Sequence, residues 1–487
     1  MASNPTSTSD SQSLYDLLGT ELPAGHRFTF HHVSTPPTKC DPLFAPPPGQ
    51  KPEITFCESQ FLTASITTPN NAAGQAVIVF AIEILIYTTK RLTTIFVAKA
   101  DSTGHLTELQ LPRSQASPVR TIASVYISWL VERRQRPGKR LVVSLFARAQ
   151  DQYLFPGSVD NKGKHVLNDR QLVKWWCKTL DPVLRQEPKE TVGENGQFDK
   201  DTTASRGYVI VPGFDRNETT TFFPSSWRAD PPDKRRWQYG HPLEEIAANP
   251  AAPPRCLVPR FPDDPKARYL DELDEELPDT SHSQTQSSPT KRGSGVWRSI
   301  KTLDQFWETM AFRQECSSGR LVGFVWIVFT PSDFDDCLDS GDSSAQHSVL
   351  PPLSNGHDLP SLDERIPRKQ TRRKKLTGPV ITRQPRVKTS SSAHSAGLGP
   401  EGSVYFKWPE SSRGQIVLDE AAYTRTHDLL LRLDFATLGA AMESSHKWFE
   451  EVHLTAGRPG VWGKAIEGSH QDVHAITGTP AGLSNEK

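Results

Sequence analysis

The sequence predicts one mixed α/β domain that is interrupted by disordered insertions. Strand-like and helix-like segments intermix without a regular βαβ rhythm, which favours a single intermixed α/β domain. The apolar share of the 487 residues is 36%, below the globular average of about 45–50%, so long polar segments must dilute an ordered core. Two stretches, 278–295 and 331–402, have no hydrophobic periodicity and supply those polar segments.

Charge balance and missing motifs exclude several classes of protein. Lys and Arg together number 56, as do Asp and Glu, so the net charge is zero and direct sequence-specific nucleic-acid binding is not expected. The six cysteines form no CxxC pair, which predicts free thiols and no metal site. The motifs GxxxxGK[ST], HExxH and GxSxG are absent, so P-loop, zincin and α/β-hydrolase chemistry lack support.

No segment predicts a membrane span or a secretory leader. The most apolar run, 77–87, contains Glu83 and is about half of the ~20 residues that a membrane helix needs. The N-terminus lacks a basic and then apolar leader. A soluble, intracellular protein without membrane association is therefore expected.

The first half of the chain predicts four strands and two helices after a disordered N-terminus at 1–12. A short amphipathic segment opens at Leu14. Runs rich in Val, Ile, Phe and Thr predict strands at 54–67, 77–87, 92–97 and 141–146. Ser117 before Pro118 marks one helix start, and a second helix follows Asn168.

The second half predicts further elements around the two insertions. One helix starts at Pro265, and another carries Trp297, Phe306 and Trp307. Short strands are predicted at 207–212, 321–329, 404–408 and 416–418, and a last helix at 429–433. The domain is thus expected to span 13–465, with disordered insertions at 278–295 and 331–402 and a disordered tail at 466–487.

The helix start at Ser117 has the features of an anion site. A helix N-terminus offers unpaired N–H groups and partial positive charge, and Arg120 and Thr121 in the first turn add donors. An ordinary capped surface helix with a solvated arginine explains the same residues.

Trp175 and Trp176 are neighbours on a predicted helix, so their rings point about 100° apart. One ring is expected to pack inward while the other lines a groove. Two half-buried core aromatics are the alternative.

The block 258–268 is the part of the sequence that most strongly indicates a functional site. Asp264 before Pro265 is an ordinary helix start. Two further features of the block are not explained by a helix start alone. The adjacent carboxylates of Asp263 and Asp264 repel each other, which suits one of them to act as a base. Lys266 lies in the first turn, where its charge opposes the helix dipole, and acetylation would remove that conflict.

The run 368–388 contains nine Lys or Arg and no acidic residue. It predicts a nuclear localisation signal or a nucleic-acid patch. A solvated disordered stretch is the alternative.

In combination, these blocks resemble the fungal regulator-of-Ty-transposition histone acetyltransferases, distant structural relatives of the metazoan CREB-binding-protein acetyltransferase. The resemblance covers 10–465 without the insertions, and the DDPKAR block and the tryptophan pair are its most specific parts. The matching stretches are 97–102, 117–121, 146–155, 164–176, 261–268, 405–408 with Gly414, and 429–435.

The resemblance implies an acetyltransferase fold, with a central mixed sheet wrapped by helices and loops. It implies acetyl-CoA as donor and a histone H3 lysine as acceptor. By position, the implied cofactor contacts are Ala100, Asp101, Ser102, Ser117, Arg120, Thr121, Phe146, Arg148, Gln150, Lys164, His165, Val166, Leu167, Trp175 and Arg268. The implied active-site residues are Tyr153, Trp176, Asp263 and Asp264, and Lys266 matches an autoacetylated lysine.

The family also suggests roles for individual groups. The metazoan relatives have a tyrosine where this chain has Trp176, and an indole N–H lacks the acidity to protonate a leaving thiolate. Trp176 is therefore expected to shape the lysine tunnel. Asp264 is expected to act as base or positioning group, with Asp263 in support.

The resemblance further implies a nuclear enzyme of replication-coupled chromatin assembly and the DNA-damage response. Its expected partners are histone H3–H4 and two chaperone types, nucleosome-assembly-protein (vacuolar-protein-sorting) and anti-silencing-function. Its expected acceptors are a folded-core lysine at the start of the first H3 helix and lysines of the H3 tail. Two alternatives stay open: a non-catalytic chromatin or histone-chaperone interaction protein that retains the fold, and an acetyltransferase of non-histone proteins or small amines.

Overall fold

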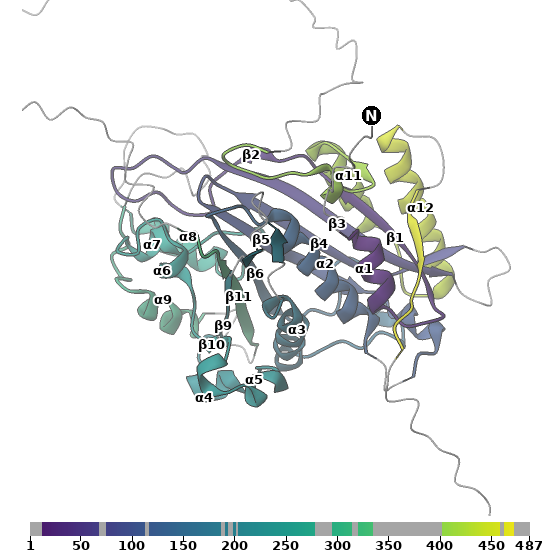
Figure 1. Ribbon diagram of the computed structural model, residues 1–487, viewed down its shortest axis with the longest axis horizontal. Helices are drawn as coiled ribbons and strands as arrows, with labels where there is room; N and C mark the ends of the chain where they lie inside the picture. The colour runs from purple at the N-terminus through teal and green to yellow at the C-terminus, as the bar shows by residue number, and fades with distance from the viewer. Residues whose placement is uncertain are drawn as a thin grey trace, which may run out of the picture. The chain divides into compact units, whose positions relative to one another are not determined.

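A large mixed β-sheet forms the frame of the fold (Figure 1). In the computed structural model, the described residues are 12–67, 75–112, 116–186, 190–192, 198–200, 203–277, 295–313, 320–334, 402–457 and 462–471. Within them, one sheet has 11 strands and helices flank it, so the predicted mixed α/β class is confirmed. The basic run 368–388 and nearly all of the segments predicted to be disordered lie outside the described residues.

The large sheet combines long central strands with short edge strands. They are β1 (Arg27–Ser34), β2 (Thr38–Cys40), β3 (Thr55–Thr67), β4 (Ala76–Thr88), β5 (Leu92–Ser102), β6 (Arg140–Arg148), β9 (Ala204–Ile210), β10 (Trp237–Tyr239), β11 (Val322–Thr330), β12 (Ile416–Val417) and β13 (Lys464–Glu467). A separate pair is formed by β7 (Glu190–Val192) and β8 (Phe198–Lys200).

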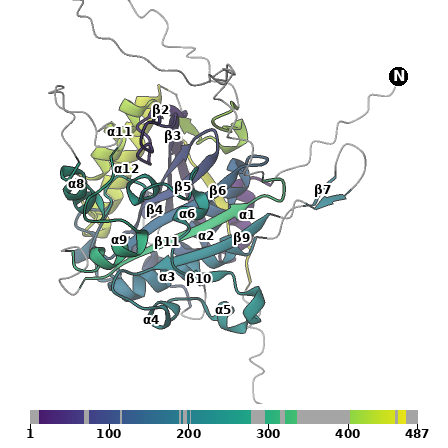
Figure 2. The same cartoon turned by 90° about the vertical axis from the view of Figure 1, so that its left-hand side faces the viewer.

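The longer helices cover the two faces of the sheet, and shorter ones lie toward its β10 end (Figures 1 and 2). They are α1 (Leu14–Glu21), α2 (Pro118–Arg134), α3 (Asp169–Leu184), α4 (Arg216–Thr220), α5 (Ser225–Ala229), α6 (Leu243–Ile246), α7 (Pro254–Leu257), α8 (Ala267–Glu275), α9 (Leu303–Met310), α11 (Glu420–Leu430) and α12 (Leu438–Ala456).

The strand order is β10-β9-β11-β6-β5-β4-β3-β1-β12, with β13 also on β1 and β2 on β3. Most neighbours are antiparallel, but β5 and β6 are parallel and α2 connects them. The helix of such a crossover runs back along the sheet. Its N-terminus therefore lies at the end of the sheet where the two parallel strands finish, which is where ligands bind in many α/β proteins.

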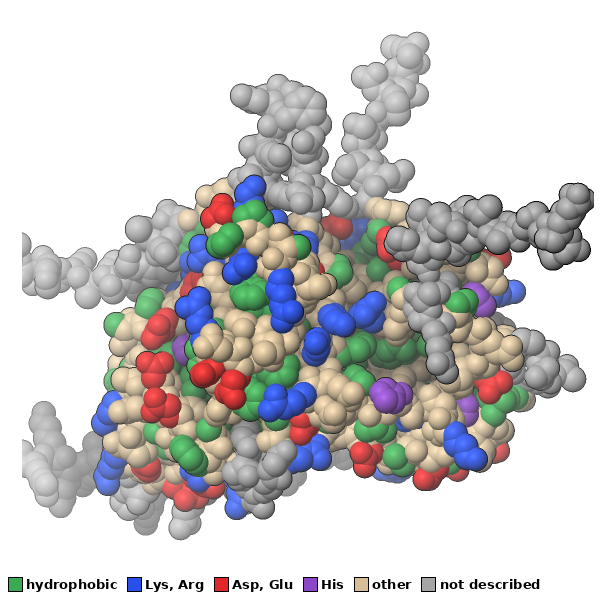
Figure 3. Space-filling view, turned by 90° about the horizontal axis from the view of Figure 1, so that it is seen from below, with side chains coloured by type: hydrophobic (Ala, Val, Ile, Leu, Met, Phe, Trp, Pro, Cys, Tyr) green, Lys and Arg blue, Asp and Glu red, His purple; other side chains and the backbone are tan. Residues whose placement is uncertain are grey.

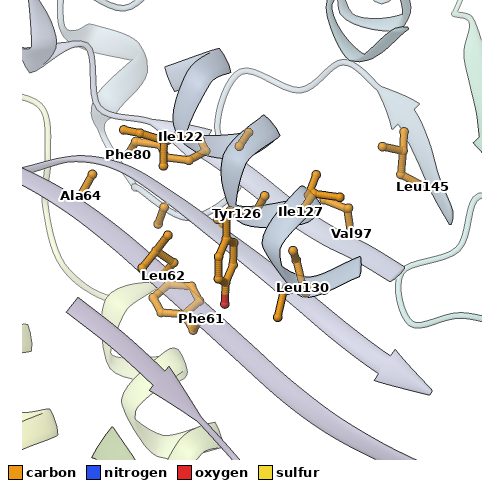
Figure 4. Packing of buried hydrophobic residues seen from close by; sticks show 14 of the residues in the cluster. Phe61, Leu62, Ala64, Phe80, Val97, Ile122, Tyr126, Ile127, Leu130 and Leu145 are labelled. Carbon is orange, nitrogen blue, oxygen red and sulfur yellow. The ribbon is translucent and has the colours of Figure 1, made fainter. Parts of the chain in front are cut away.

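The packing of α2 fixes this crossover. Ile122, Tyr126 and Leu130 recur on one side of the helix and are buried in the main core. Figure 4 shows Ile122 near Phe80, a residue of β4 that pairs with Ser102 at the end of β5. The first turn of α2 is thereby held beside the carboxyl end of β5.

Two adjacent histidines of β1 face the two helical layers. Successive strand residues point to opposite faces of a sheet. The His31 ring stacks on Phe449 of α12 with centroids 3.9 Å apart, while Nε2 of His32 lies 2.9 Å from the hydroxyl of Tyr126 in α2. The sheet is therefore sandwiched between α2 and α12.

These histidines predict that the protein loses stability in mild acid. Burial lowers the pKa of His31 to about 3 and that of His32 to about 4, whereas histidine in an unfolded chain titrates near about 6.5. The unfolded chain therefore binds more protons as the pH falls toward and below that value, and each histidine removes about 2 kcal/mol of unfolding free energy between about pH 7 and pH 5.

Urea unfolding at several pH values measures this effect. The variant His31→Phe should lose about 2 kcal/mol of the pH dependence, and the variant of an exposed histidine of α12, His446→Gln, should retain it all. Equal pH dependence in wild type and His31→Phe would contradict the prediction.

Several predicted boundaries are confirmed. Ser117 is the N-cap residue of α2, which begins at Pro118. Asn168 caps α3, and its side chain accepts a hydrogen bond from the Gln171 N–H. The predicted strands at 54–67, 77–87, 92–97 and 141–146 correspond to β3, β4, β5 and β6.

Other predictions are wrong in detail. The helix predicted from Pro265 begins at Ala267, because the Asp264 carboxylate binds the Lys266 N–H in the preceding turn. Trp297 precedes α9 rather than lying on it. The expected strand at 404–408 is only an isolated bridge, Gly402 to Lys407. The last predicted helix, 429–433, captures only the end of α11, which stops at Leu430.

The predicted disordered tail from 466 begins too early. Residues 462–471 are described, and Ile466 and Glu467 pair with Phe28 and Arg27 of β1. His470 forms a further bridge to Pro23. The segment is held by this pairing and by Trp462, whose ring contacts His31 and whose Nε1–H donates to the carbonyl of Phe449 at 3.0 Å.

Candidate active site

The two parallel strands of the crossover separate at their carboxyl ends. β5 and β6 pair only as far as Phe96 with Ser144, although both strands continue. The register between β4 and β5 shifts directly afterwards, leaving Ala98 as an extra residue between Val97 and Lys99. Such a bulge bends its strand and is common beside active sites. The bulge therefore lies where β5 and β6 separate.

The N-terminus of α2 provides unpaired donors at this end of the sheet. Ser117 occupies the N-cap position, but its side chain makes no capping hydrogen bond. The helix therefore retains free N–H groups and partial positive charge in its first turn. Among the described residues, no side chain pairs with Arg120. This turn, in which Thr121 is half-buried, has the donors that the predicted anion site requires, and the site itself stays a prediction.

Asp101 organises the loop that faces the end of β5. Its Oδ2 accepts hydrogen bonds from the N–H groups of Tyr153 at 2.7 Å and Leu154 at 2.9 Å, and its Oδ1 accepts from Lys164 Nζ at 2.8 Å. Ser102 N–H also donates to Oδ1 at 2.8 Å. The carboxylate is thus used within the protein. Asp101 holds the Tyr153–Leu154 loop against the end of β5. Its carboxylate is therefore not free to bind a cofactor.

Lys164 is likewise committed to the protein. Its buried ammonium group also donates to Ser158 Oγ at 2.7 Å. Its backbone packs tightly on Gly104, whose φ is +86°, and a Cβ there would lie 2.5 Å from Lys164 N. The following residues His165 and Val166 are exposed and Leu167 is half-buried. Only the backbone of Lys164 and this following segment are accessible to a ligand.

Tyr153 lies in the loop that Asp101 holds. Its hydroxyl donates to the carbonyl of Arg148 at the end of β6, and burial raises its pKa to about 12. In the amide orientation that satisfies both groups, Gln150 accepts from Arg148 Nε at 3.2 Å. The structure thus brings Asp101, Tyr153, Arg148 and Gln150 together at the strand ends.

The tryptophan pair divides as predicted. Trp176 is buried in the main core, while Trp175 is half-buried. Their rings meet edge to face with centroids 4.8 Å apart. Trp175 is therefore the ring that remains partly exposed, and Trp176 is part of the core.

Asp264 and Lys266 form a buried ion pair. Lys266 Nζ lies 2.6 Å from Oδ2 and 2.8 Å from Oδ1 of Asp264, and Lys266 N–H donates to Oδ1 at 2.8 Å. The Asp264 side chain is 0% exposed and that of Lys266 is 4% exposed. Burial lowers the pKa of Lys266, which the charge of Asp264 opposes. The expected conflict between Lys266 and the helix dipole is therefore relieved by Asp264.

Asp263 has a separate lysine partner. Its side chain is 70% exposed, and Oδ2 lies 3.4 Å from Nζ of Lys99 on β5. Its backbone has a φ of 53°, a left-handed conformation that is uncommon outside glycine. The predicted repulsion between the adjacent carboxylates is thus wrong, because each carboxylate faces its own lysine.

Aromatic stacking attaches this loop to the sheet. The Phe261 ring lies parallel to Phe96 of β5 with centroids 4.1 Å apart, and Phe96 contacts Phe146 of β6. Phe96 is also the last residue of β5 that pairs with β6. Phe261 therefore anchors the carboxylate loop where the strands separate.

Of the residues predicted to contact the cofactor, Arg268 has the position that fits this prediction least well. Its side chain is 68% exposed and lies 3.6 Å from Glu272 on the same helix. Ala100 is half-buried near the end of β5.

Figure 3 shows one face of the molecule from below, where Lys and Arg side chains gather in the middle. Such a surface favours anionic ligands.

Sequence reasoning missed Lys99, Phe96 and Glu83. Lys99 directly precedes the predicted contacts 100–102, and a charged residue late in an apolar strand was the available signal. Glu83 interrupts the most apolar run of the chain, which was also visible. Neither residue reveals its partner without the strand register.

Taken together, the structure gathers an uncapped helix start and two carboxylates near the ends of two separating strands. The chain matches the family model of the histone acetyltransferase KAT11-type domain over 14–140 and 136–451. It therefore belongs to this family and is a histone lysine acetyltransferase, as the sequence resemblance implied. The family is defined by acetyl transfer, so acetyl-CoA is its expected donor.

The chain is also similar to individual proteins of this family. It is 42% identical to the histone acetyltransferase rtt109 of Aspergillus flavus, over 95% of this chain and 86% of the relative. It is 30% identical to that of Schizosaccharomyces pombe, over 64% and 70%. The crystal structure of Rtt109 from Aspergillus fumigatus superposes with a TM-score of 0.72 at 41% identity, covering 95% of this chain and all of that chain.

Two further properties concern the part of the chain that the structure describes. No helix there combines the length and the hydropathy of a membrane span. No group of three or more His, Cys, Asp or Glu side chains there is arranged to hold a metal ion.

Proposed function

We propose that the chain transfers the acetyl group of acetyl-CoA to histone H3 lysines, in H3–H4 that histone chaperones deliver. The acceptors are the folded-core lysine at the start of the first H3 helix and lysines of the H3 tail. The chaperones are of the nucleosome-assembly-protein (vacuolar-protein-sorting) and anti-silencing-function types. The setting is the nucleus, in replication-coupled chromatin assembly and the DNA-damage response, with the basic run 368–388 as the import signal.

The observation that carries this proposal is the separation of β5 and β6 above the uncapped start of α2. CoA brings a pyrophosphate and a 3′-phosphate, and free N–H groups with Arg120 suit such an anion. In this proposal, Ala100, Ser102, Phe146 and the half-buried ring of Trp175 line the rest of the cofactor groove. The donor supplies an acetyl thioester, and the residues of this chain bind it and position the acceptor.

The chemistry needs a neutral lysine amine that attacks the thioester carbonyl. A C–N bond forms, the C–S bond breaks, and the amine loses a proton to a nearby carboxylate or water. The burial of Asp264 favours its positioning role over a base role, because both of its oxygens bind Lys266. The exposed Asp263 is the carboxylate of this pair that an acceptor can reach. Trp176 shapes the acceptor tunnel through its packing, and Tyr153 lines its wall.

The test is acetyl transfer from radiolabelled acetyl-CoA to H3–H4, with and without a chaperone. Label on H3 should increase with the chaperone, and it should fall at least about tenfold in Trp176→Ala. Lys447→Met, which removes an exposed ion pair with Glu443, is the matched control and should label H3 like wild type.

Other outcomes decide between the alternatives. Label on no protein, with the enzyme itself also unlabelled, would favour a non-catalytic chromatin or histone-chaperone interaction protein. Acetylation of a free small amine without histone or chaperone would favour an acetyltransferase of other substrates. Label on Lys266 is expected from the family and would support autoacetylation.

A further inference from the structure

We propose that Lys99 is a positioning residue of the active site. Its ammonium group holds the exposed carboxylate of Asp263 beside the groove and is itself held by the buried carboxylate of Glu83. This inference rests on the proposed function, because it takes Asp263 to lie next to the acceptor amine.

Glu83 provides a fixed base for this arrangement. It is buried in the middle of the apolar strand β4, where an unpaired carboxylate would be strongly unfavourable. Tyr423 Oη of α11 donates to its Oε1 at 2.8 Å, and Nε2 of His427 lies 3.5 Å from its Oε2. Burial raises the pKa of Glu83, but His427, Lys99 and Tyr423 outweigh this effect and bring the pKa to about 2. Glu83 therefore remains an anion.

The bulge in β5 brings Lys99 to this anion. With Val97 opposite Ile84, an unbroken register would place Ala98 opposite Glu83 and turn Lys99 to the other face. The extra residue shifts the register, so Lys99 lies opposite Glu83 instead. Lys99 Nζ then lies 3.4 Å from Glu83 Oε2. The bulge that lies where β5 and β6 separate thus directs this ammonium group toward Glu83.

The second contact of Lys99 constrains a residue that has little else to hold it. Asp263 is exposed, lies in a turn and has a left-handed backbone. Its Oδ2 lies 3.4 Å from Lys99 Nζ, and the Lys99 side chain is only 22% exposed. The backbone of Lys99 is fixed in β5, and its ammonium group is fixed by Glu83. Lys99 therefore restricts where the Asp263 carboxylate can lie. Misplacement of a reacting group by about 1 Å can lower a rate about a hundredfold.

The test compares Lys99→Met and Lys99→Arg with the Lys447→Met control in steady-state acetylation of H3–H4. Lys99→Met should lower kcat about tenfold to a hundredfold. Lys99→Arg keeps a cation between the two carboxylates and should recover kcat to within about fivefold of wild type. Calorimetric affinity for CoA should stay within about twofold in all variants, because other residues build the anion site.

A second variant keeps the test decisive if Lys99→Met folds poorly. Tyr423→Phe removes one hydrogen bond from Glu83 and should lower kcat about fivefold, again with unchanged CoA affinity. Wild-type kcat in Lys99→Met, or in Tyr423→Phe when Lys99→Met does not fold, would overturn the proposal. A loss of CoA affinity that parallels the loss of kcat would overturn it too, because it would indicate a role in the fold alone. If wild type acetylates nothing, the proposed function itself fails.

Discussion

Asp264→Asn should destabilise the protein by about 3–5 kcal/mol, because it leaves the buried Lys266 ammonium group without its anion. It should also lower kcat about a hundredfold under conditions where the variant is folded, since the turn that carries Asp263 is no longer fixed. Chemical denaturation and steady-state acetylation of H3–H4 measure the two effects.

A double-mutant cycle measures the interaction energy between Asp264 and Lys266 separately from the effect of each single substitution. Lys266→Gln should be comparably destabilising, whereas Asp264→Asn combined with Lys266→Gln should cost clearly less than the sum of the two, because no charge is left buried alone. Glu443→Gln breaks an exposed ion pair with Lys447 and should cost less than about 1 kcal/mol. Intact stability and unchanged activity in Asp264→Asn would rule out both its positioning role and its base role.

Asp101→Ala should have the second large effect, a loss of about 3–5 kcal/mol together with at least a tenfold loss of CoA affinity. The substitution removes the acceptor for the N–H groups of Tyr153 and Leu154 and leaves the Lys164 ammonium group buried and unpaired. The loop at the strand ends would then be free to enter the cofactor space. Denaturation and calorimetric titration with CoA measure both quantities.

Asp160→Ala is the matched control, since Asp160 is an exposed acidic residue on the neighbouring 3-10 turn. It should change stability by no more than about 0.5 kcal/mol and leave CoA affinity unchanged. If Asp101→Ala binds CoA as wild type does, then the loop does not shape the cofactor site.

The elements with strong local signals were predictable from sequence. Two helix starts have local signals, Ser117 before Pro118 and Asn168 with Gln171. The helices α2 and α3 begin there. β1 was missed, because its two adjacent histidines break the apolar pattern although both are buried. The helix α12 was missed because Ala and Ser occupy much of its buried face.

The candidate site was predictable in its residues and less so in its interactions. Sequence adjacency suggested that Asp263 and Asp264 repel each other, but tertiary contacts assign Lys99 to the first and Lys266 to the second. Asp101 was expected to contact cofactor, yet its hydrogen bonds reach a loop about fifty residues later in the chain. Strand register and loop closure decide such pairings, and neither is encoded in a local pattern.

The placement of β13 has a consequence for synthesis on the ribosome. β1 emerges long before its outer partner β13, and Ser469 Oγ donates to the carbonyl of Gly19 across 450 positions of sequence. Until β13 leaves the exit tunnel, this edge of β1 lacks its antiparallel neighbour and presents open backbone groups to other chains. The nascent chain therefore carries an unpaired strand edge during the synthesis of most of the domain.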